Sequence, residues 1–131
     1  MEVHLKIAGS LMVALGLMHV ALPRFFKWNQ ELSPLNLITK QIVYVHTFFI
    51  GFMILLMGVL CIYSSAEIVN PGLGHQISLG LFVFWFTRLI FQFFVYSPKV
   101  WRGKKFETTM HFIFSSLWAY FSFVFFRIYW N

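Results

Sequence analysis

Apolar residues occur along the chain in four long runs, and polar residues gather in the segments between them. The runs cover roughly 5–26, 41–63, 76–97 and 109–129. Each is long enough for a bilayer crossing, which takes about 20 largely apolar helical residues. Apolar and polar residues do not alternate inside the runs, and this argues against membrane-spanning strands. The pattern therefore predicts four transmembrane α-helices.

The segments between the runs contain the residues that end helices. The first, 27–40, holds a proline and several apolar residues, so we expect part of it to lie in the membrane interface. The second, 64–75, contains an Asn-Pro-Gly turn signal. The third, 98–107, is short, so the helices on either side of it should be antiparallel neighbours. The sequence thus predicts one all-α domain over 1–131, an up-down four-helix transmembrane bundle.

Composition favours a membrane protein over a soluble one. Of the 131 residues, 60% are hydrophobic and 11% are charged, and none is aspartate, whereas soluble domains average about 25% charged residues. Lipid or partner proteins must therefore cover the outside of the bundle. The start of the chain carries both Glu2 and Lys6, and no small-residue cleavage site closes the first run, so we expect a retained helix rather than a cleaved signal peptide.

The formal net charge of +6 indicates membrane orientation rather than nucleic-acid binding, because the basic residues lie between the apolar runs. Those that flank the first and third connections are Arg24, Lys27, Lys40, Lys99, Arg102, Lys104 and Lys105. Only Lys6 and Arg127 flank the opposite side. Cytoplasmic segments are enriched in Lys and Arg. We therefore predict that these two connections are cytoplasmic, that both termini lie on the non-cytoplasmic side, and that the membrane is a bacterial inner membrane.

Polar and ionisable residues inside the runs are costly in hydrocarbon, so each is a candidate functional residue. Depth along a helix follows from a rise of about 1.5 Å per residue. With the predicted orientation, five such residues from all four helices fall in the cytoplasmic half of the membrane: His19, His46, Arg88, Gln92 and His111. We therefore expect one polar layer inside the bundle.

Helical spacing adds neighbours to this layer, because residues three and four apart share a helix face. Arg88 and Gln92 share a face of the third helix with aromatic residues, and His111 shares a face of the fourth with serines and a tryptophan. Lipid offers these groups no hydrogen bonds, so both faces should point into the bundle. The predicted ligand-binding residues are Trp85, Arg88, Gln92, Ser115 and Trp118.

The first two helices raise a question of orientation. His19 shares a face with Gly16, and a glycine there would allow close approach of a neighbouring helix. On the second helix, His46 lies on one face, and Gly51 and Gly58 lie on another. The sequence leaves open which of these two faces is interior.

The first run contains Gly16 and His19 and is followed at its cytoplasmic end by Arg24 and Lys27. In these features it resembles the opening of small four-helix bacterial membrane proteins of the DoxX type. The resemblance is limited to this run, and it implies no role for any individual residue.

The three histidines His19, His46 and His111 predict a ligand set for haem b or a transition metal, because imidazoles from facing helices bind both. The alternative is that they only form interhelical hydrogen bonds. Arg88 predicts recognition of an anionic or quinone-like ligand, or else it bonds nearby groups and extends towards the surface. The runs contain no carboxylates, which argues against a hard-cation site and an acidic proton relay.

Three classes of function remain open. The class that we favour is a ligand-binding or redox membrane protein using the histidines and Arg88. The second is an accessory or scaffold subunit of a larger membrane complex, and the third is an oligomeric transporter of small solutes or anions. The expected partners are membrane lipid and either further copies of the chain or a larger complex. No set of catalytic residues is evident, and Cys61, the only cysteine, excludes an intramolecular disulfide.

Overall fold

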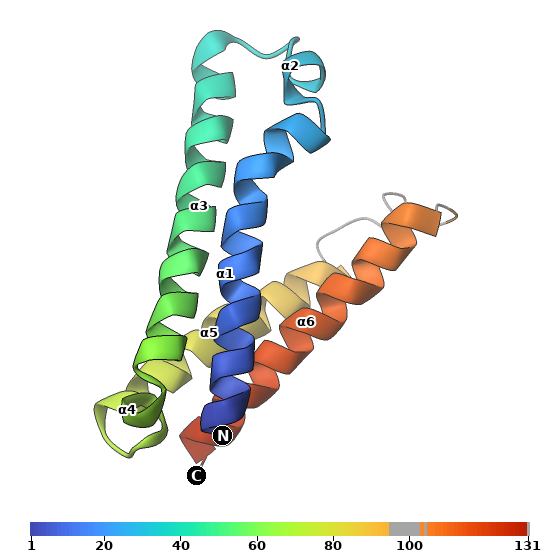
Figure 1. The fold of residues 1–131 in the computed structure, drawn as a ribbon. Helices are drawn as coiled ribbons and strands as arrows, with labels where there is room; N and C mark the ends of the chain where they lie inside the picture. Colours follow the sequence, from blue (N-terminus) through green and yellow to red (C-terminus); the bar gives the residue numbers. More distant parts are fainter. Residues whose placement is uncertain (95–102, 104, 131) are drawn as a thin grey trace. The chain divides into compact units, whose positions relative to one another are not determined.

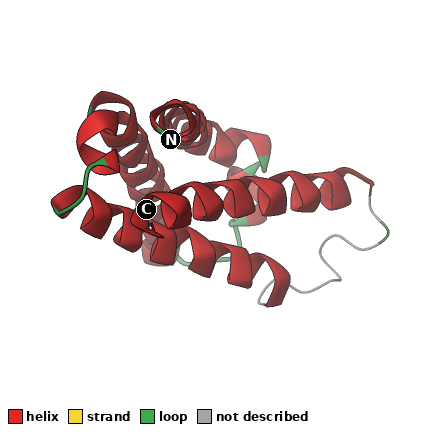
Figure 2. Cartoon of the chain, turned by 90° about the horizontal axis from the view of Figure 1, so that it is seen from below, coloured by secondary structure: helices red, strands yellow, loops and turns green. Residues whose placement is uncertain are grey.

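The computed structural model describes residues 1–94, 103 and 105–130, which form helices joined by short turns (Figure 1, Figure 2). The helices are α1 (Glu2–Phe25), α2 (Trp28–Glu31), α3 (Leu37–Tyr63), α4 (Ser65–Val69), α5 (Leu73–Phe94) and α6 (Lys105–Trp130). The described residues contain no strand, so the predicted all-α class is confirmed. Helices α1, α3, α5 and α6 are each long and apolar enough to cross a membrane, which indicates an integral membrane protein.

The first predicted connection, 27–40, contains more helix than expected. Helix α2 occupies part of it, and α3 begins at Leu37 rather than at residue 41. The start of α3 is capped by the Asn36 side chain, which accepts a hydrogen bond from the Thr39 N–H at 3.2 Å. This bond satisfies one of the backbone donors that a helix start leaves unpaired. A favourable cap therefore extends the second span into the predicted connection.

The second predicted connection, 64–75, holds the short helix α4 and a tight turn. Gly72 has a φ of 101°, a conformation that glycine adopts at little cost. His75 Nε2 lies 3.0 Å from the Val69 carbonyl oxygen. A carbonyl only accepts, so the imidazole N–H donates and ties α4 to the start of α5. Helix α5 consequently begins at Leu73, earlier than the predicted residue 76.

The third predicted connection, 98–107, lies largely outside the described residues, as does the end of the predicted third span, 95–97. Helix α6 begins at Lys105 instead of residue 109, so its first turn replaces the end of that connection.

The chain divides into two compact units. The first, here called the N-terminal hairpin, is Leu5–Ser65 and contains most of α1 together with α2 and α3. The second, here called the C-terminal hairpin, is Ala66–Asn131 together with Met1–His4, and it contains most of α4 together with α5 and α6.

Glycines bring α1 and α3 close together within the N-terminal hairpin, where the two helices run side by side (Figure 1). A Cβ added at Gly16 would lie 2.6 Å from the Gly51 carbonyl oxygen, and one added at Gly58 would lie 2.5 Å from the Gly9 carbonyl oxygen. On each helix the two glycines are about two turns apart and so lie along one contact line. The predicted close approach at Gly16 is confirmed, and the glycine face of α3 is interior.

Aromatic rings pack between α5 and α6 in the C-terminal hairpin. Ring centroids are 5.5 Å apart for Phe82 and Phe126 and 5.1 Å apart for Trp85 and Trp118. Residue numbers thus rise along one helix as they fall along the other, so the two helices are antiparallel. Trp85 and Phe121 are fully buried at this contact.

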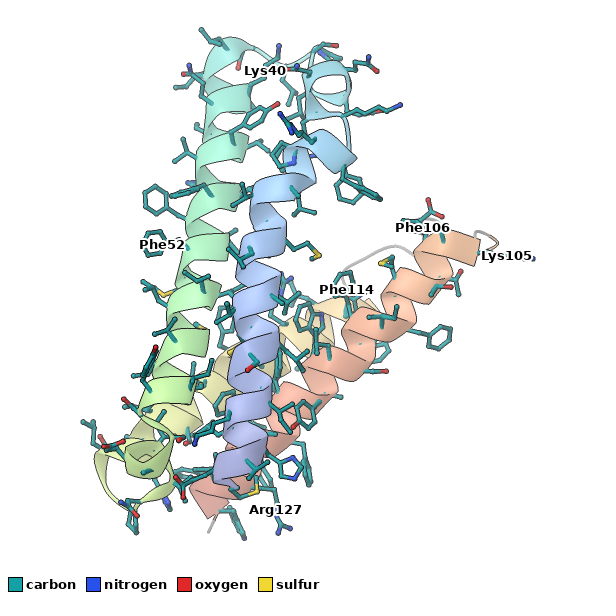
Figure 3. All side chains as sticks on the ribbon, in the orientation of Figure 1. Lys40, Phe52, Lys105, Phe106, Phe114 and Arg127 are labelled. Carbon is teal, nitrogen blue, oxygen red and sulfur yellow. The ribbon has the colours of Figure 1, made fainter. Side chains whose placement is uncertain are left out.

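Large apolar side chains cover the exposed surface of both units. Figure 3 shows one of them, Phe52, on the side of α3 away from α1. Others that are more than a third exposed are Val20, Phe49, Met53, Phe86, Phe94, Phe112 and Phe123. An apolar surface of this extent marks a protein that is covered by lipid or by partner proteins.

Candidate ligand-binding site

The predicted ligand-binding residues of α5 and α6 come together in the C-terminal hairpin. On α5, Trp85 is fully buried, and Arg88 and Gln92 are half-buried at helical spacing. The corresponding buried residues of α6 are His111, Ser115 and Trp118. The predicted faces of both helices are therefore the ones that pack inside this unit.

Gln92 joins the two helices through both ends of its side-chain amide. Trp118 Nε1–H donates to Gln92 Oε1 at 3.3 Å, and Gln92 Nε2 lies 2.9 Å from His111 Nδ1. An indole N–H can only donate, so it determines that the amide oxygen faces Trp118. The amide NH₂ then faces His111 and donates to Nδ1. A neutral His111 consequently carries its proton on Nε2.

Arg88 lies over the face of the Trp118 ring, with its guanidinium carbon 5.2 Å from the ring centroid. It forms no ion pair within the described part of the chain, although all four glutamates are described there. Arg88 is within about two turns of Phe94, the described end of α5. An arginine inside a bilayer costs about 3 kcal/mol or more. A cation–π contact returns about 0.5–2 kcal/mol, so the ring offsets only part of this cost.

Trp118 is the centre of an aromatic stack. Its ring stacks on Trp85 with 22° between the ring planes and on Phe114 with 17°, at centroid distances of 5.1 Å and 5.6 Å. Trp85 also meets Phe121 edge-on at 4.8 Å. This packing holds the Trp118 ring in place. The packing therefore fixes the Trp118 N–H, which donates to Gln92, and the ring face that Arg88 covers.

Two buried polar atoms of this site have no hydrogen-bond partner among the described residues: Trp85 Nε1 and Ser115 Oγ. A buried donor left unpaired costs about 1–3 kcal/mol. Serine in a helix commonly donates to the carbonyl one turn earlier, as Ser122 does to the Trp118 carbonyl at 2.8 Å. Ser115 is on the same face of α6 but lacks this bond, so the site holds two buried groups that protein atoms leave unsatisfied.

His19 and His46 lie in the N-terminal hairpin. His19 is half-buried, and a Cβ added at Gly51 would lie 2.5 Å from the His19 Cβ, so this histidine packs against α3. Its Nδ1 lies 2.7 Å from the Leu15 carbonyl oxygen and must donate. The Nε2 of neutral His19 therefore carries a lone pair. His46 is exposed on an α3 face that does not carry the glycines, which answers the question that the sequence left open.

The predicted set of three histidines stays a prediction, because His111 belongs to a different unit from His19 and His46. The same holds for the single polar layer across all four helices. Within the described residues, no group of three or more His, Cys, Asp or Glu is arranged to hold a metal ion. The tautomers also differ, since His19 presents a lone pair at Nε2 and His111 presents a proton there.

Sequence reasoning did not single out Phe114 and Phe121, which pack against the two tryptophans. Each lies one helical turn from Trp118, so helical spacing alone would have placed them beside it. The chain contains 18 phenylalanines, and most positions one turn from any residue in α6 are aromatic or apolar. Only the contacts distinguish the two phenylalanines of the site from those on the lipid-exposed surface.

Comparisons with known proteins do not identify a relative of this chain. No protein-family model matches the chain, and neither a curated protein nor a solved structure matches it significantly.

Proposed function

We propose that this membrane protein binds an anionic amphiphile, whose charged group pairs with Arg88 and whose apolar part lies against α5 and α6. The observation that carries the proposal is a half-buried guanidinium on a membrane-length helix with no acidic partner in the described chain. Such a charge is costly in hydrocarbon. An anion that forms charge-assisted hydrogen bonds with it removes much of that cost.

The surroundings of Arg88 suit both parts of such a ligand. Trp118 supports one side of the guanidinium, and the described site contains no carboxylate that would compete with an anion. Phe84 and Phe91, about one turn to either side of Arg88, are 38% and 48% exposed. These rings offer apolar surface to an acyl chain beside the charge. Fatty-acid carboxylates and phospholipid phosphates are the two sources of this ligand chemistry.

The test compares lipid binding to the wild type with binding to Arg88→Gln and Arg127→Gln, by native mass spectrometry of the full chain in mild detergent. Arg127 is a matched control, because its guanidinium carbon lies 5.9 Å from the Phe123 ring centroid, yet it is exposed near the end of α6 (Figure 3). The probes are palmitate, phosphatidylglycerol, and phosphatidylcholine with the same chains. Phosphatidylcholine is the zwitterionic reference.

We expect Arg88→Gln to lower the affinity for the anionic probes at least about tenfold, since a hydrogen bond to a charged group contributes about 1.5–3 kcal/mol. Phosphatidylcholine binding should not change, and Arg127→Gln should bind as the wild type does. Equal losses in the two variants would instead show general attraction to positive charge and would contradict a site at Arg88.

We further propose that the first and third connections face the cytoplasm of a bacterial inner membrane and that both termini lie outside. The support is the excess of Lys and Arg, which includes Lys40 and Lys105 near the starts of α3 and α6 (Figure 3). In a Cys61→Ala background, an impermeant maleimide should label Asn70→Cys in intact spheroplasts. Ser33→Cys should react only after permeabilisation. The reverse pattern would invert the proposed orientation.

Haem or metal binding is the second candidate, and one observation favours it. The Nδ1–H of His19 donates to a backbone carbonyl, an arrangement that fixes the ring and the tautomer of many ligating histidines. The test is an optical spectrum and elemental analysis of the purified protein. A Soret band, or stoichiometric zinc, copper or iron, that is lost in His19→Ala would support this role. A colourless, metal-free and folded protein would reject it.

The accessory-subunit and transporter alternatives have distinct readouts. A subunit of a larger complex copurifies with other chains and loses stability when isolated. An anion transporter gives flux in liposomes that falls in Arg88→Gln and not in Arg127→Gln. Lipid binding without flux in the same preparation supports the amphiphile-binding role.

A further inference from the structure

We infer that the amphiphile is a diacyl glycerophospholipid, whose phosphate pairs with Arg88 and whose ester carbonyl oxygen accepts the N–H of Trp85. This inference rests on the proposed anion site and names the ligand of that same site. It concerns the two buried polar atoms that the protein leaves unpaired, Trp85 Nε1 and Ser115 Oγ.

The order of the donors along α5 matches the order of the acceptors in such a lipid. Arg88 is nearer to Phe94 than to the start of α5 at Leu73. Trp85 is about one turn, or about 4.5 Å, further from the end at Phe94. A headgroup that enters from this end meets Arg88 first. The ester carbonyls of a glycerophospholipid lie between the phosphate and the acyl chains, and so they reach the level of Trp85.

The chemistry of the unpaired donor requires an acceptor. The indole N–H of Trp85 can only donate, its residue is fully buried, and a bilayer core supplies no bulk water to satisfy it. A fatty acid whose carboxylate pairs with Arg88 has only methylene groups one turn deeper. A diacyl lipid places a carbonyl oxygen there. The two ligands therefore differ at the atom that Trp85 needs.

One ring connects the two binding positions. The guanidinium carbon of Arg88 lies 5.2 Å from the centroid of the Trp118 ring. The same ring stacks on Trp85, with 5.1 Å between the two ring centroids. Both donors therefore border one aromatic stack, and because the Trp85 N–H is fully covered, an ester oxygen reaches it only where a neighbouring side chain moves aside. Because the Trp85 ring is also packed edge-on against Phe121, its N–H cannot turn to another partner without disrupting the stack.

Ser115 supplies a donor to the phosphate. Ser115 lies at about the level of Arg88 on the opposite helix. The α5–α6 contacts on either side of this level are Trp85 with Trp118 and Gln92 with His111. The Ser115 hydroxyl is free of the local carbonyl bond that Ser122 forms. Ser115→Ala should therefore weaken phosphatidylglycerol binding about threefold to fivefold, a loss typical of one hydrogen bond.

The decisive experiment gives the full-length protein an equimolar mixture of ester-linked and ether-linked phosphatidylglycerol with identical chains. The ether lipid lacks only the carbonyl oxygens. Native mass spectrometry then reads the ratio of the two complexes. The wild type should prefer the ester lipid by about fivefold, the contribution of one hydrogen bond, and Trp85→Phe should bring the ratio to about one.

The design contains its own controls. Both lipids compete in one sample, so the ratio does not depend on the folded fraction of a variant. Trp130→Phe makes the same chemical change at a residue that is 74% exposed at the end of α6, and it should keep the wild-type ratio. Arg88→Gln should lower binding of both lipids and leave the preference for the ester lipid in the remaining complex.

The outcomes separate this inference from the proposed function. A wild-type ratio of one, an unchanged preference in Trp85→Phe, or palmitate binding as tight as that of phosphatidylglycerol would overturn the ester contact. A buried water satisfying Trp85 would produce the first of these results. The anion site would still stand if Arg88→Gln lowered binding of every anionic probe. If no anionic probe bound the wild type, both proposals would fail.

Discussion

The two hairpins hold their helices together by different means. In the N-terminal hairpin, glycines let the backbones of α1 and α3 meet, and no side chain–side chain hydrogen bond joins these helices among the described residues. In the C-terminal hairpin, Gln92, His111 and Trp118 link α5 to α6 with directed hydrogen bonds. Membrane helices use both small residues and polar side chains for association, and this chain separates the two means.

The difference indicates which hairpin carries a ligand. Among the described residues, the glycine contact leaves no buried polar side-chain atom unpaired, and the ring of His19 forms a hydrogen bond with its own helix. The C-terminal hairpin retains an arginine without an ion pair and two unpaired buried atoms within the described chain. Such features cost stability and are not needed to join two helices. Unsatisfied polarity, rather than polarity alone, is what marks the candidate site.

The largest expected effect breaks the glycine contact. Gly58→Ala places a Cβ 2.5 Å from the Gly9 carbonyl oxygen, and a backbone atom cannot move aside cheaply. We expect the free energy of unfolding in detergent to fall by about 2 kcal/mol or more. Gly80→Ala is the control, because nothing lies within 4 Å of its added Cβ, and it should be neutral or stabilising. Equal effects of the two substitutions would contradict tight packing of α1 on α3.

The next effect removes the centre of the polar network. Gln92→Leu deprives the Trp118 N–H of its acceptor and His111 Nδ1 of its donor. We expect a loss of about 1–2 kcal/mol in the free energy of unfolding, the cost of leaving a buried donor unpaired. Gln76→Leu, an exposed glutamine on the same helix, should change it by less than about 0.5 kcal/mol. A neutral Gln92→Leu variant would show that the network contributes nothing to helix pairing.

A tautomer measurement sharpens the same point. Gln92→Glu, once its carboxyl is ionised, places only acceptor oxygens beside Trp118 and His111, so Nδ1 of His111 must then carry a proton. Nitrogen-15 NMR of labelled histidine distinguishes the two tautomers. We expect Nε2–H in the wild type and Nδ1–H in the variant. A proton on Nδ1 of His111 in the wild type would contradict the deduced direction of the Gln92 hydrogen bonds.

A smaller effect separates two serines on one face of α6. Ser115→Ala removes a buried hydroxyl that has no partner in the described chain, so in lipid-free detergent it should be neutral or stabilise by up to about 1 kcal/mol. Ser122→Ala removes a hydroxyl bonded to the Trp118 carbonyl, and it should be neutral or destabilising by about 0.5 kcal/mol. Thermal unfolding of both variants compares them. The opposite order would indicate that Ser115 is paired.

The smallest effect concerns His46, which is exposed in the N-terminal hairpin. His46→Leu should change the free energy of unfolding by less than about 0.5 kcal/mol, as substitutions at exposed positions usually do. His19→Leu loses a hydrogen bond to Leu15 and alters packing at Gly51, so it should cost about 1 kcal/mol. A large loss in His46→Leu, or a loss of bound metal or haem, would return His46 to the predicted ligand set.

The site could be predicted from the sequence to the extent that it depends on one helix at a time. Spacing placed Trp85 with Arg88 on α5 and Ser115 with Trp118 on α6, and the structure buries these faces as expected. The helix starts were predicted less well. The length of an apolar run does not show where a helix begins, and here the starts depend on a side-chain cap at Asn36 and a positive φ at Gly72.

The sequence by itself determined the helical class and the four membrane-length segments, since run length and the scarcity of charge are local properties that need no partner helix. Only the tertiary structure decided that the glycine face of α3 is interior, that Gln92 fixes the tautomer of His111, and that the Trp85 N–H is left unpaired. Each of these findings depends on which atom of a neighbouring helix lies opposite the residue concerned. Helical periodicity specifies the direction in which a side chain points, whereas the partner that it meets there is set by packing.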